Sequence, residues 1–163
     1  MHHKDDVRAE RMCRDLLPRM RKALGSLHPS TLGAVDTLGQ LLQTKGDICG
    51  ACRYLEEAMA GRRGTLGNEH PDVVHSMMSL CSVYSAADRA DEAISLGEQA
   101  LNILKLPGRI VSERTMGIAL GNVGSAYLQN DDLAAAKPHL EASSEIFSRI
   151  CESLTSLADL EFI

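Results

Sequence analysis

The sequence predicts an all-α solenoid of about three helical hairpins, preceded by a single N-terminal helix. Three observations predict this fold. The stretch LGSLHPS at residues 24–30 returns as LGNEHPD at residues 66–72, so His70 follows His28 by 42 residues. Apolar residues at helical spacing follow each copy in two blocks. A breaker separates the two blocks at residues 44–47, 86–89 and 129–132.

The first expected element is a helix over residues 5–27, the second half of an earlier, partial repeat. Ala9 lies 42 residues before Ala51, so the chain starts in the middle of a unit, which favours a piece of a longer array. The helix carries several arginines beside an apolar stripe, a pattern that can bind anionic membranes. We favour a solvated outer face, because acidic residues interrupt the positive charge and Leu24 and Gly25 end the helix in register.

The first and second hairpins are expected over residues 28–69 and 70–111. Pro29 and Pro71 suit the first turn of a helix, where a missing amide donor costs nothing. Gly25 and Gly67 suit the end of the helix before. The repeated stretch is therefore the boundary between hairpins, and it recurs because the hairpin recurs.

The third hairpin is expected over residues 112–150, with Glu113 and Arg114 in place of His-Pro. Pro138 falls inside its second helix, where it predicts a bend or a lost hydrogen bond. Gly97 replaces a large residue in the second hairpin and predicts irregular packing there. Residues 151–163 are expected to form a tail or a capping segment, and open ends would allow self-association of the solenoid. Within residues 151–163, Leu154, Leu157 and Leu160 are the residues expected to cap the last hairpin.

The composition excludes several classes of function. A chain of 163 residues with 44% hydrophobic residues can bury one continuous core. A net charge of −5 opposes the phosphate attraction on which nucleic-acid binding depends. No run has the length needed to cross a bilayer, and the N-terminus shows no apolar export segment. We therefore expect a cytoplasmic protein with no nucleic-acid or membrane partner.

Cys49 and Cys52 form the one motif with potential chemistry, a CxxC that could be a redox pair or half of a metal site. A redox pair of the thioredoxin type needs a preceding strand, whereas these residues open the second helix of a repeat. A zinc site needs about two more ligands nearby, and no second CxxC follows. We expect packing thiols, no metal, no cofactor and no enzyme activity; a thiol redox protein is the alternative.

At the repeated positions the chain resembles the tetratricopeptide repeat family, whose pattern is a large residue, Leu-Gly, Tyr and then Ala. The 42-residue period and the His-Pro entry resemble the variety found in kinesin light chains. The matching residues are Val35, Leu38, Gly39, Leu42, Ala51 and Leu55 in the first copy; Met77, Leu80, Cys81, Tyr84, Ala93 and Gly97 in the second; and Leu120, Val123, Gly124, Tyr127, Ala136 and Leu140 in the third.

This resemblance implies a right-handed superhelix that binds a peptide or a helix in a concave groove lined by the first helix of each hairpin. The implied groove residues are Asp36, Thr37, Gln40, Gln43, His75, Met78, Ser79, Ser82, Ile118, Asn122, Ser125 and Leu128. None is Lys or Arg, which favours an uncharged partner segment over an acidic tail. The leading interpretation is a non-catalytic scaffold or adaptor for a protein or peptide partner. A purely structural, self-associating segment is a further alternative.

Overall fold

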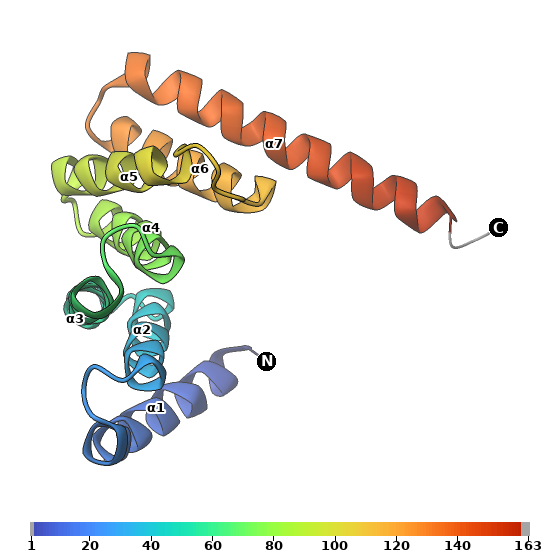
Figure 1. The fold of residues 1–163 in the computed structure, drawn as a ribbon. Coiled ribbons are helices and arrows are strands. Elements are labelled where there is room, and N and C mark those ends of the chain that lie inside the picture. Colours follow the sequence, from blue (N-terminus) through green and yellow to red (C-terminus); the bar gives the residue numbers. More distant parts are fainter. Residues whose placement is uncertain (1, 161–163) are drawn as a thin grey trace.

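The computed structural model describes the backbone of residues 2–160 and the side chains of residues 8–153. This part of the chain contains seven α-helices and no strand (Figure 1). The helices are α1 (His2–Leu24), α2 (Pro29–Thr44), α3 (Ile48–Leu66), α4 (Pro71–Ala86), α5 (Ala90–Leu104), α6 (Glu113–Gln129) and α7 (Leu133–Leu160). The prediction of an all-α superhelix is confirmed.

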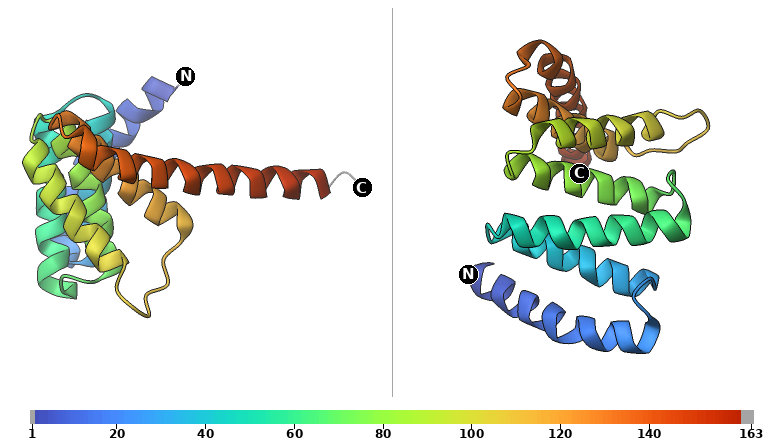
Figure 2. Two further views of the ribbon diagram at one scale, coloured as in Figure 1. Left: turned by 90° about the horizontal axis from the view of Figure 1, so that it is seen from above. Right: turned by 90° about the vertical axis from the view of Figure 1, so that its left-hand side faces the viewer.

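The helices are stacked in chain order along one direction (Figures 1 and 2). Each helix packs against the next one in the sequence, and contacts also join α2 to α4 and α4 to α6. The first helices of successive hairpins therefore lie side by side and together form one wall of the stack.

The loops between hairpins follow the predicted chemistry. Pro71 occupies the first turn of α4, and His70 caps this helix by accepting a hydrogen bond from the Asp72 amide at its Nδ1 atom, at 3.1 Å. Gly67, which ends α3, has a φ angle of 83°, a conformation that favours glycine. The third hairpin begins differently, because Ser112 caps α6 by accepting from the Thr115 amide at 3.1 Å.

Within the first and third hairpins, one glycine lets the two helices approach closely. A Cβ atom added at Gly39 would lie 2.7 Å from Leu55 Cγ, and one added at Gly124 would lie 2.6 Å from Leu140 Cγ. These distances are far below van der Waals contact, so no larger residue fits there without rearrangement. The two glycines hold equivalent places, as the repeat predicts.

The second hairpin reverses this arrangement. Its first helix has Cys81 at the glycine position, and its second helix has Gly97 where the others have leucine. A Cβ atom at Gly97 would lie 3.1 Å from Cys81 Sγ and 2.5 Å from Val123 Cγ2. The space left by the missing leucine is therefore filled from both sides, and the irregular packing expected at Gly97 does not occur.

A polar cluster joins the first hairpin to the second. Tyr84 donates a hydrogen bond from its hydroxyl to Glu56 at 2.8 Å, and the Arg89 guanidinium lies 3.9 Å from the centre of its ring. Arg89 also donates to Glu56 at 3.3 Å. Burial, followed by the bond to Glu56, raises the pKa of Tyr84 to about 12, so the phenol stays neutral and remains the donor.

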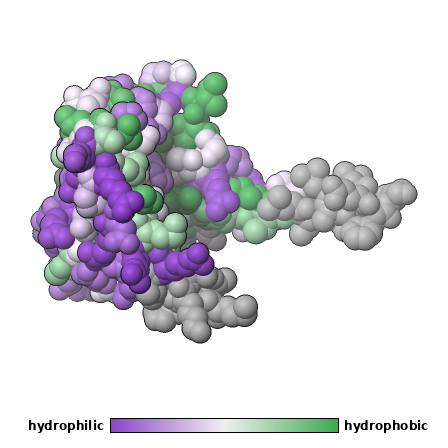
Figure 3. Space-filling model, turned by 90° about the horizontal axis from the view of Figure 1, so that it is seen from below, coloured by the Kyte–Doolittle hydropathy of each residue, from purple (hydrophilic) through white to green (hydrophobic). Residues whose placement is uncertain are grey.

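The C-terminal segment differs from the expected tail. Residues 151–160 continue α7, which runs unbroken through Pro138 and projects well beyond the stack (Figure 2). In Figure 3 hydrophobic residues are visible beside the point where this helix leaves the stack. Phe147 of α7 is 37% exposed. The leucines expected to act as a cap, Leu154, Leu157 and Leu160, lie outside the residues whose side chains are described.

Candidate functional site

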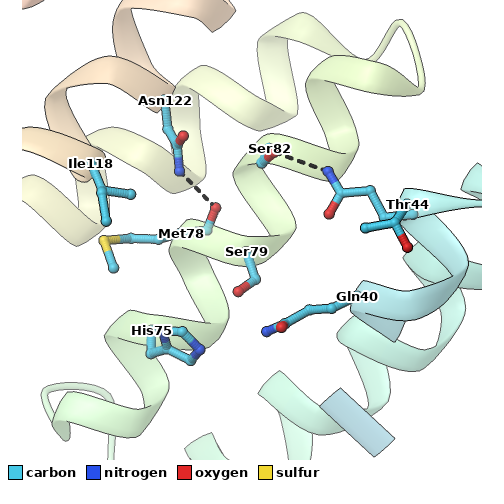
Figure 4. Close-up of a pocket in the computed structure, with 9 residues that line it drawn as sticks. Gln40, Thr44, His75, Met78, Ser79, Ser82, Ile118 and Asn122 are labelled. Carbon is cyan, nitrogen blue, oxygen red and sulfur yellow. Dashed lines mark hydrogen bonds between the residues drawn. The ribbon is translucent and has the colours of Figure 1, made fainter. Parts of the chain in front are cut away.

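The first helices of the three hairpins, α2, α4 and α6, surround a hollow of about 390 Å³ (Figure 4). Its lining consists of amide, hydroxyl and imidazole side chains with two apolar ones. These residues are Gln40, Gln43, Thr44, His75, Met78, Ser79, Ser82, Ile118 and Asn122. All except Thr44 are among the groove positions that the resemblance implies. Thr44 lies one helical turn after Gln40, so helical spacing alone could have found it.

Two hydrogen bonds fix amide side chains in the wall of this hollow (Figure 4). Gln43 donates from Nε2 to Ser82 Oγ at 3.0 Å and so links α2 to α4. Asn122 donates from Nδ2 to the backbone carbonyl of Met78 at 3.0 Å and so links α4 to α6. Both amides keep an oxygen that accepts no hydrogen bond from the described residues, and these oxygens can receive donors from a bound segment.

Asp36 does not line the hollow as expected. Its carboxylate is buried and forms an ion pair with Arg62 at 3.2 Å, while Gln40 donates to it at 3.0 Å. Arg62 also donates to Ser76 Oγ at 2.6 Å. Removing Arg62 would leave a buried charge without its counter-ion, so the pair belongs to the packing of α2, α3 and α4. Asp36 is therefore unavailable to a partner.

Three other expected positions, Thr37, Ser125 and Leu128, are exposed but lie outside the hollow. Met78 does line it, yet only 8% of this residue is exposed because it also packs in the core. Ile118 is 39% exposed and provides the accessible apolar contact of the hollow. A substitution at Ile118 therefore tests binding with less cost to stability than one at Met78.

The hollow carries little charge. Its described lining contains no Lys, Arg, Asp or Glu, and the one titratable group there is His75, whose Nε2 lies 3.9 Å from Asp36 Oδ2. Without a cation in that lining, the site offers no counter-ion to an acidic peptide. Its chemistry suits backbone amides, carbonyls and small apolar side chains.

The CxxC pair consists of one exposed thiol, Cys49, and one buried thiol, Cys52, and both are free. Burial raises the pKa of the Cys52 thiol, which disfavours Cys52 as a thiolate nucleophile. Among the described residues no group of His, Cys, Asp and Glu could hold a metal ion. None of the helices, as far as the structure describes them, could span a membrane.

Comparison with known proteins agrees with this architecture. Residues 37–105 match the model of the tetratricopeptide repeat family. Two solved structures of a kinesin light chain-like protein of Podosopora anserina, the second of them a variant with one substitution, have nearly identical TPR-like repeats. Both are 26% identical to this chain over 91% and 92% of its length, with TM-scores of 0.72 and 0.75. No curated protein matched.

BtubC (BKLC) from P. vanneervenii shares the fold, with a TM-score of 0.80 and 16% identity over 90% of this chain. The chain spans 58% of BtubC and 70% of the Podosopora structures. The described chain is thus an all-α superhelix with the fold of tetratricopeptide-repeat solenoids. Its repeats are similar to those of the kinesin light chain-like structures.

Proposed function

We propose that this chain is a non-catalytic protein-binding module whose hollow between α2, α4 and α6 holds an uncharged extended or helical segment of a partner. The observation that carries the proposal is the hydrogen bonding of Gln43 and Asn122, which holds two amide groups in a wall that also presents Ile118. An extended peptide needs such donors and acceptors for its backbone, with apolar contacts for its side chains.

The family supports a scaffold as the general class, since tetratricopeptide repeats typically mediate protein–protein interaction rather than catalysis. We further propose the repeat boundaries 28–69, 70–111 and 112–150, and a cytoplasmic location. A scaffold in the cytoplasm accords with the free thiols of all five cysteines.

Peptide selection tests the proposed groove. Random peptides displayed on phage are selected on the purified chain, and the recovered peptides are titrated against wild type and Ile118→Asp by fluorescence anisotropy. We expect Ile118→Asp to weaken binding about tenfold or more, because a carboxylate replaces the apolar contact of the hollow. Ala60→Asp is the matched control, since it adds the same charge at an exposed position of α3 outside the hollow.

Equal binding of the recovered peptides by Ile118→Asp and wild type would show that the peptides do not bind in the hollow. The redox alternative is separated from this proposal by Cys49→Ser. We expect this variant to bind the same peptides as wild type, and the wild type to show no dithiol-dependent reductase activity. Reductase activity that disappears in Cys49→Ser would instead support the redox function.

A further inference from the structure

A second hollow, of about 340 Å³, lies between α3, α4 and α5. One arginine, three amide side chains and two apolar side chains line it: Arg63, Asn68, Gln99, Asn102, Met77 and Ile103. It shares none of its lining residues with the hollow between α2, α4 and α6. The two hollows are therefore separate sites, and a ligand of one does not contact the lining of the other.

Arg63 has no ionic partner in the part of the chain that the structure describes. Its Nε atom is buried and has no hydrogen-bond partner there either. The neighbouring Arg62, by contrast, is paired with Asp36 and Ser76. Because Arg63 lines the hollow, an anion bound there would supply the counter-ion that its guanidinium lacks.

The amide side chains around Arg63 can supply further donors. Gln99 and Asn102 are one turn apart on α5, and Asn68 lies in the loop between α3 and α4. Asn68 and Asn102 make no hydrogen bonds within the described residues, whereas Gln99 donates to Ser95 at 3.3 Å. No Asp or Glu of the described chain lines the hollow. The donor set is therefore one cation and several neutral N–H groups.

The charge and the walls of this hollow limit the ligand. A single guanidinium matches one negative charge, so a monoanion fits the hollow better than a dianion such as phosphate. A carboxylate fits the planar donors of arginine and carries one charge. Met77, which is 1% exposed, and Ile103 add an apolar wall beside these donors.

We propose that the hollow formed by Arg63, Asn68, Gln99, Asn102, Met77 and Ile103 binds a carboxylate carried on a short apolar group. The carboxylate accepts from Arg63 and from the amides, and the apolar group lies against Met77 and Ile103. A free organic acid and the C-terminal residue of a peptide both have this chemistry.

An NMR titration of the ¹⁵N-labelled chain tests the proposal. The probes are N-acetyl-leucine, the tripeptide acetyl-Gly-Gly-Leu with a free C-terminus, N-acetyl-leucine amide and inorganic phosphate. We expect both carboxylates to shift the Arg63 Nε–H signal and the Asn102 side-chain signals saturably, with the amide and phosphate at least about tenfold weaker. If the tripeptide binds more tightly than N-acetyl-leucine, the natural ligand is the C-terminus of a peptide chain. If N-acetyl-leucine binds more tightly, the natural ligand is a free organic acid.

Two variants locate the binding. Arg63→Gln is expected to weaken the binding of both carboxylate probes about tenfold. The control is Arg53→Gln, which lies on the same helix but over Tyr54 and outside the hollow, and it is expected to leave their binding unchanged. Asn102→Asp adds a negative charge at an exposed position and is also expected to weaken the binding of the carboxylate probes. This variant keeps the proposal testable if Arg63→Gln does not fold. Absence of saturable shifts, equal binding of the amide or of phosphate, or equal binding by Asn102→Asp would overturn the proposal.

Discussion

At the scale of single residues, the hairpins are held by pairs whose sizes complement each other. Gly39 faces Leu55 and Gly124 faces Leu140, whereas in the second hairpin the small and the larger partner have changed places as Cys81 and Gly97. Cysteine is smaller than leucine, and Val123 fills the rest of the space beside Gly97, so the interior there stays closely packed. Size complementarity therefore predicts that the two positions are coupled energetically.

A double-mutant cycle on Cys81 and Gly97 measures this coupling. Gly97→Leu is expected to lower the free energy of unfolding by about 1–3 kcal/mol, because its side chain enters the space of Cys81 and Val123. Cys81→Gly is expected to cost about 1–3 kcal/mol through the cavity and the helical glycine. The double variant should be more stable than the sum of the two losses predicts, by about 1 kcal/mol, as measured by urea unfolding.

The control for this cycle is Gly64→Leu combined with Cys81→Gly. Gly64 lies on α3 and no atom stands within 4 Å of an added Cβ, so its effect should be additive with that of Cys81→Gly. Additivity of Gly97→Leu with Cys81→Gly would contradict the size exchange. Val123 limits the rescue, because it approaches Gly97 as well.

At the scale of single helices, α7 departs most from its counterparts. The equivalent helices α3 and α5 span 19 and 15 residues, whereas α7 spans 28 and contains Pro138. Pro138 is exposed and has no N–H to donate to the carbonyl of Ala134, so one hydrogen bond of the helix is missing. The helix nevertheless continues through the proline.

Pro138→Ala is therefore expected to stabilise the protein. The substitution restores one helical hydrogen bond and removes the clash of the proline ring with the preceding turn, a gain of up to about 3 kcal/mol. Its exposed position means that little packing is lost. Thermal melts followed by circular dichroism should show a higher Tm than wild type.

Lys137→Ala is the control for this substitution, because it changes an exposed neighbour without altering the backbone bonds of α7. Its Tm should stay within about 2 °C of wild type, since surface substitutions typically change the free energy of unfolding by less than about 0.5 kcal/mol. A Tm that falls on Pro138→Ala would mean that the ring contributes packing that its exposure does not reveal.

Periodicity predicted the helices for a clear physical reason. Residues that repeat every 42 positions, such as His28 and His70, mark boundaries set by local backbone chemistry. The groove positions, such as Gln40 and Ile118, were instead implied by the resemblance to the tetratricopeptide repeat family, and they remain a prediction. The fate of Asp36 could not be predicted in this way. Its counter-ion, Arg62, comes from another helix, and their pairing depends on how α3 crosses α2 and α4.

The end of α7 was missed for a similar reason. Apolar residues at helical spacing after residue 150 fit both a cap and a continued helix, and Cys151 brings no glycine or proline that would stop the helix. The direction in which α7 leaves the stack depends on its packing against α6, which a linear pattern does not contain.

At the scale of the whole molecule, stability should be distributed along the stack. In the described part of the chain, packing joins only helices that are adjacent in sequence, together with α2 to α4 and α4 to α6. No contact between described residues links α1 to α7, so each hairpin is stabilised mainly by its neighbours, as in other linear repeat proteins. Native-state hydrogen exchange can measure this distribution residue by residue.

Two core substitutions, one in α1 at the end of the stack and one in α5 in its middle, test this distribution. Leu17 of α1 is 4% exposed and Leu101 of α5 is 0% exposed. Leu17→Ala and Leu101→Ala should therefore each lower the free energy of unfolding of the surrounding helices by about 2–5 kcal/mol. Leu17→Ala is expected to speed exchange at amides of α1 and α2 while leaving Val123 of α6 unchanged. Leu101→Ala should speed exchange in α4 and α6 together, because it weakens both interfaces of α5.

Equal acceleration at Val123 by the two variants would show that the chain unfolds as a single cooperative unit, with coupling that spans all seven described helices. The neighbour-only packing argues against that outcome, since the free energy lost at Leu17 reaches α6 only through α2 and α4. A gradient of protection that falls from α4 and α5 toward α1 would also explain how one end can open while the hollow between α2, α4 and α6 keeps its shape.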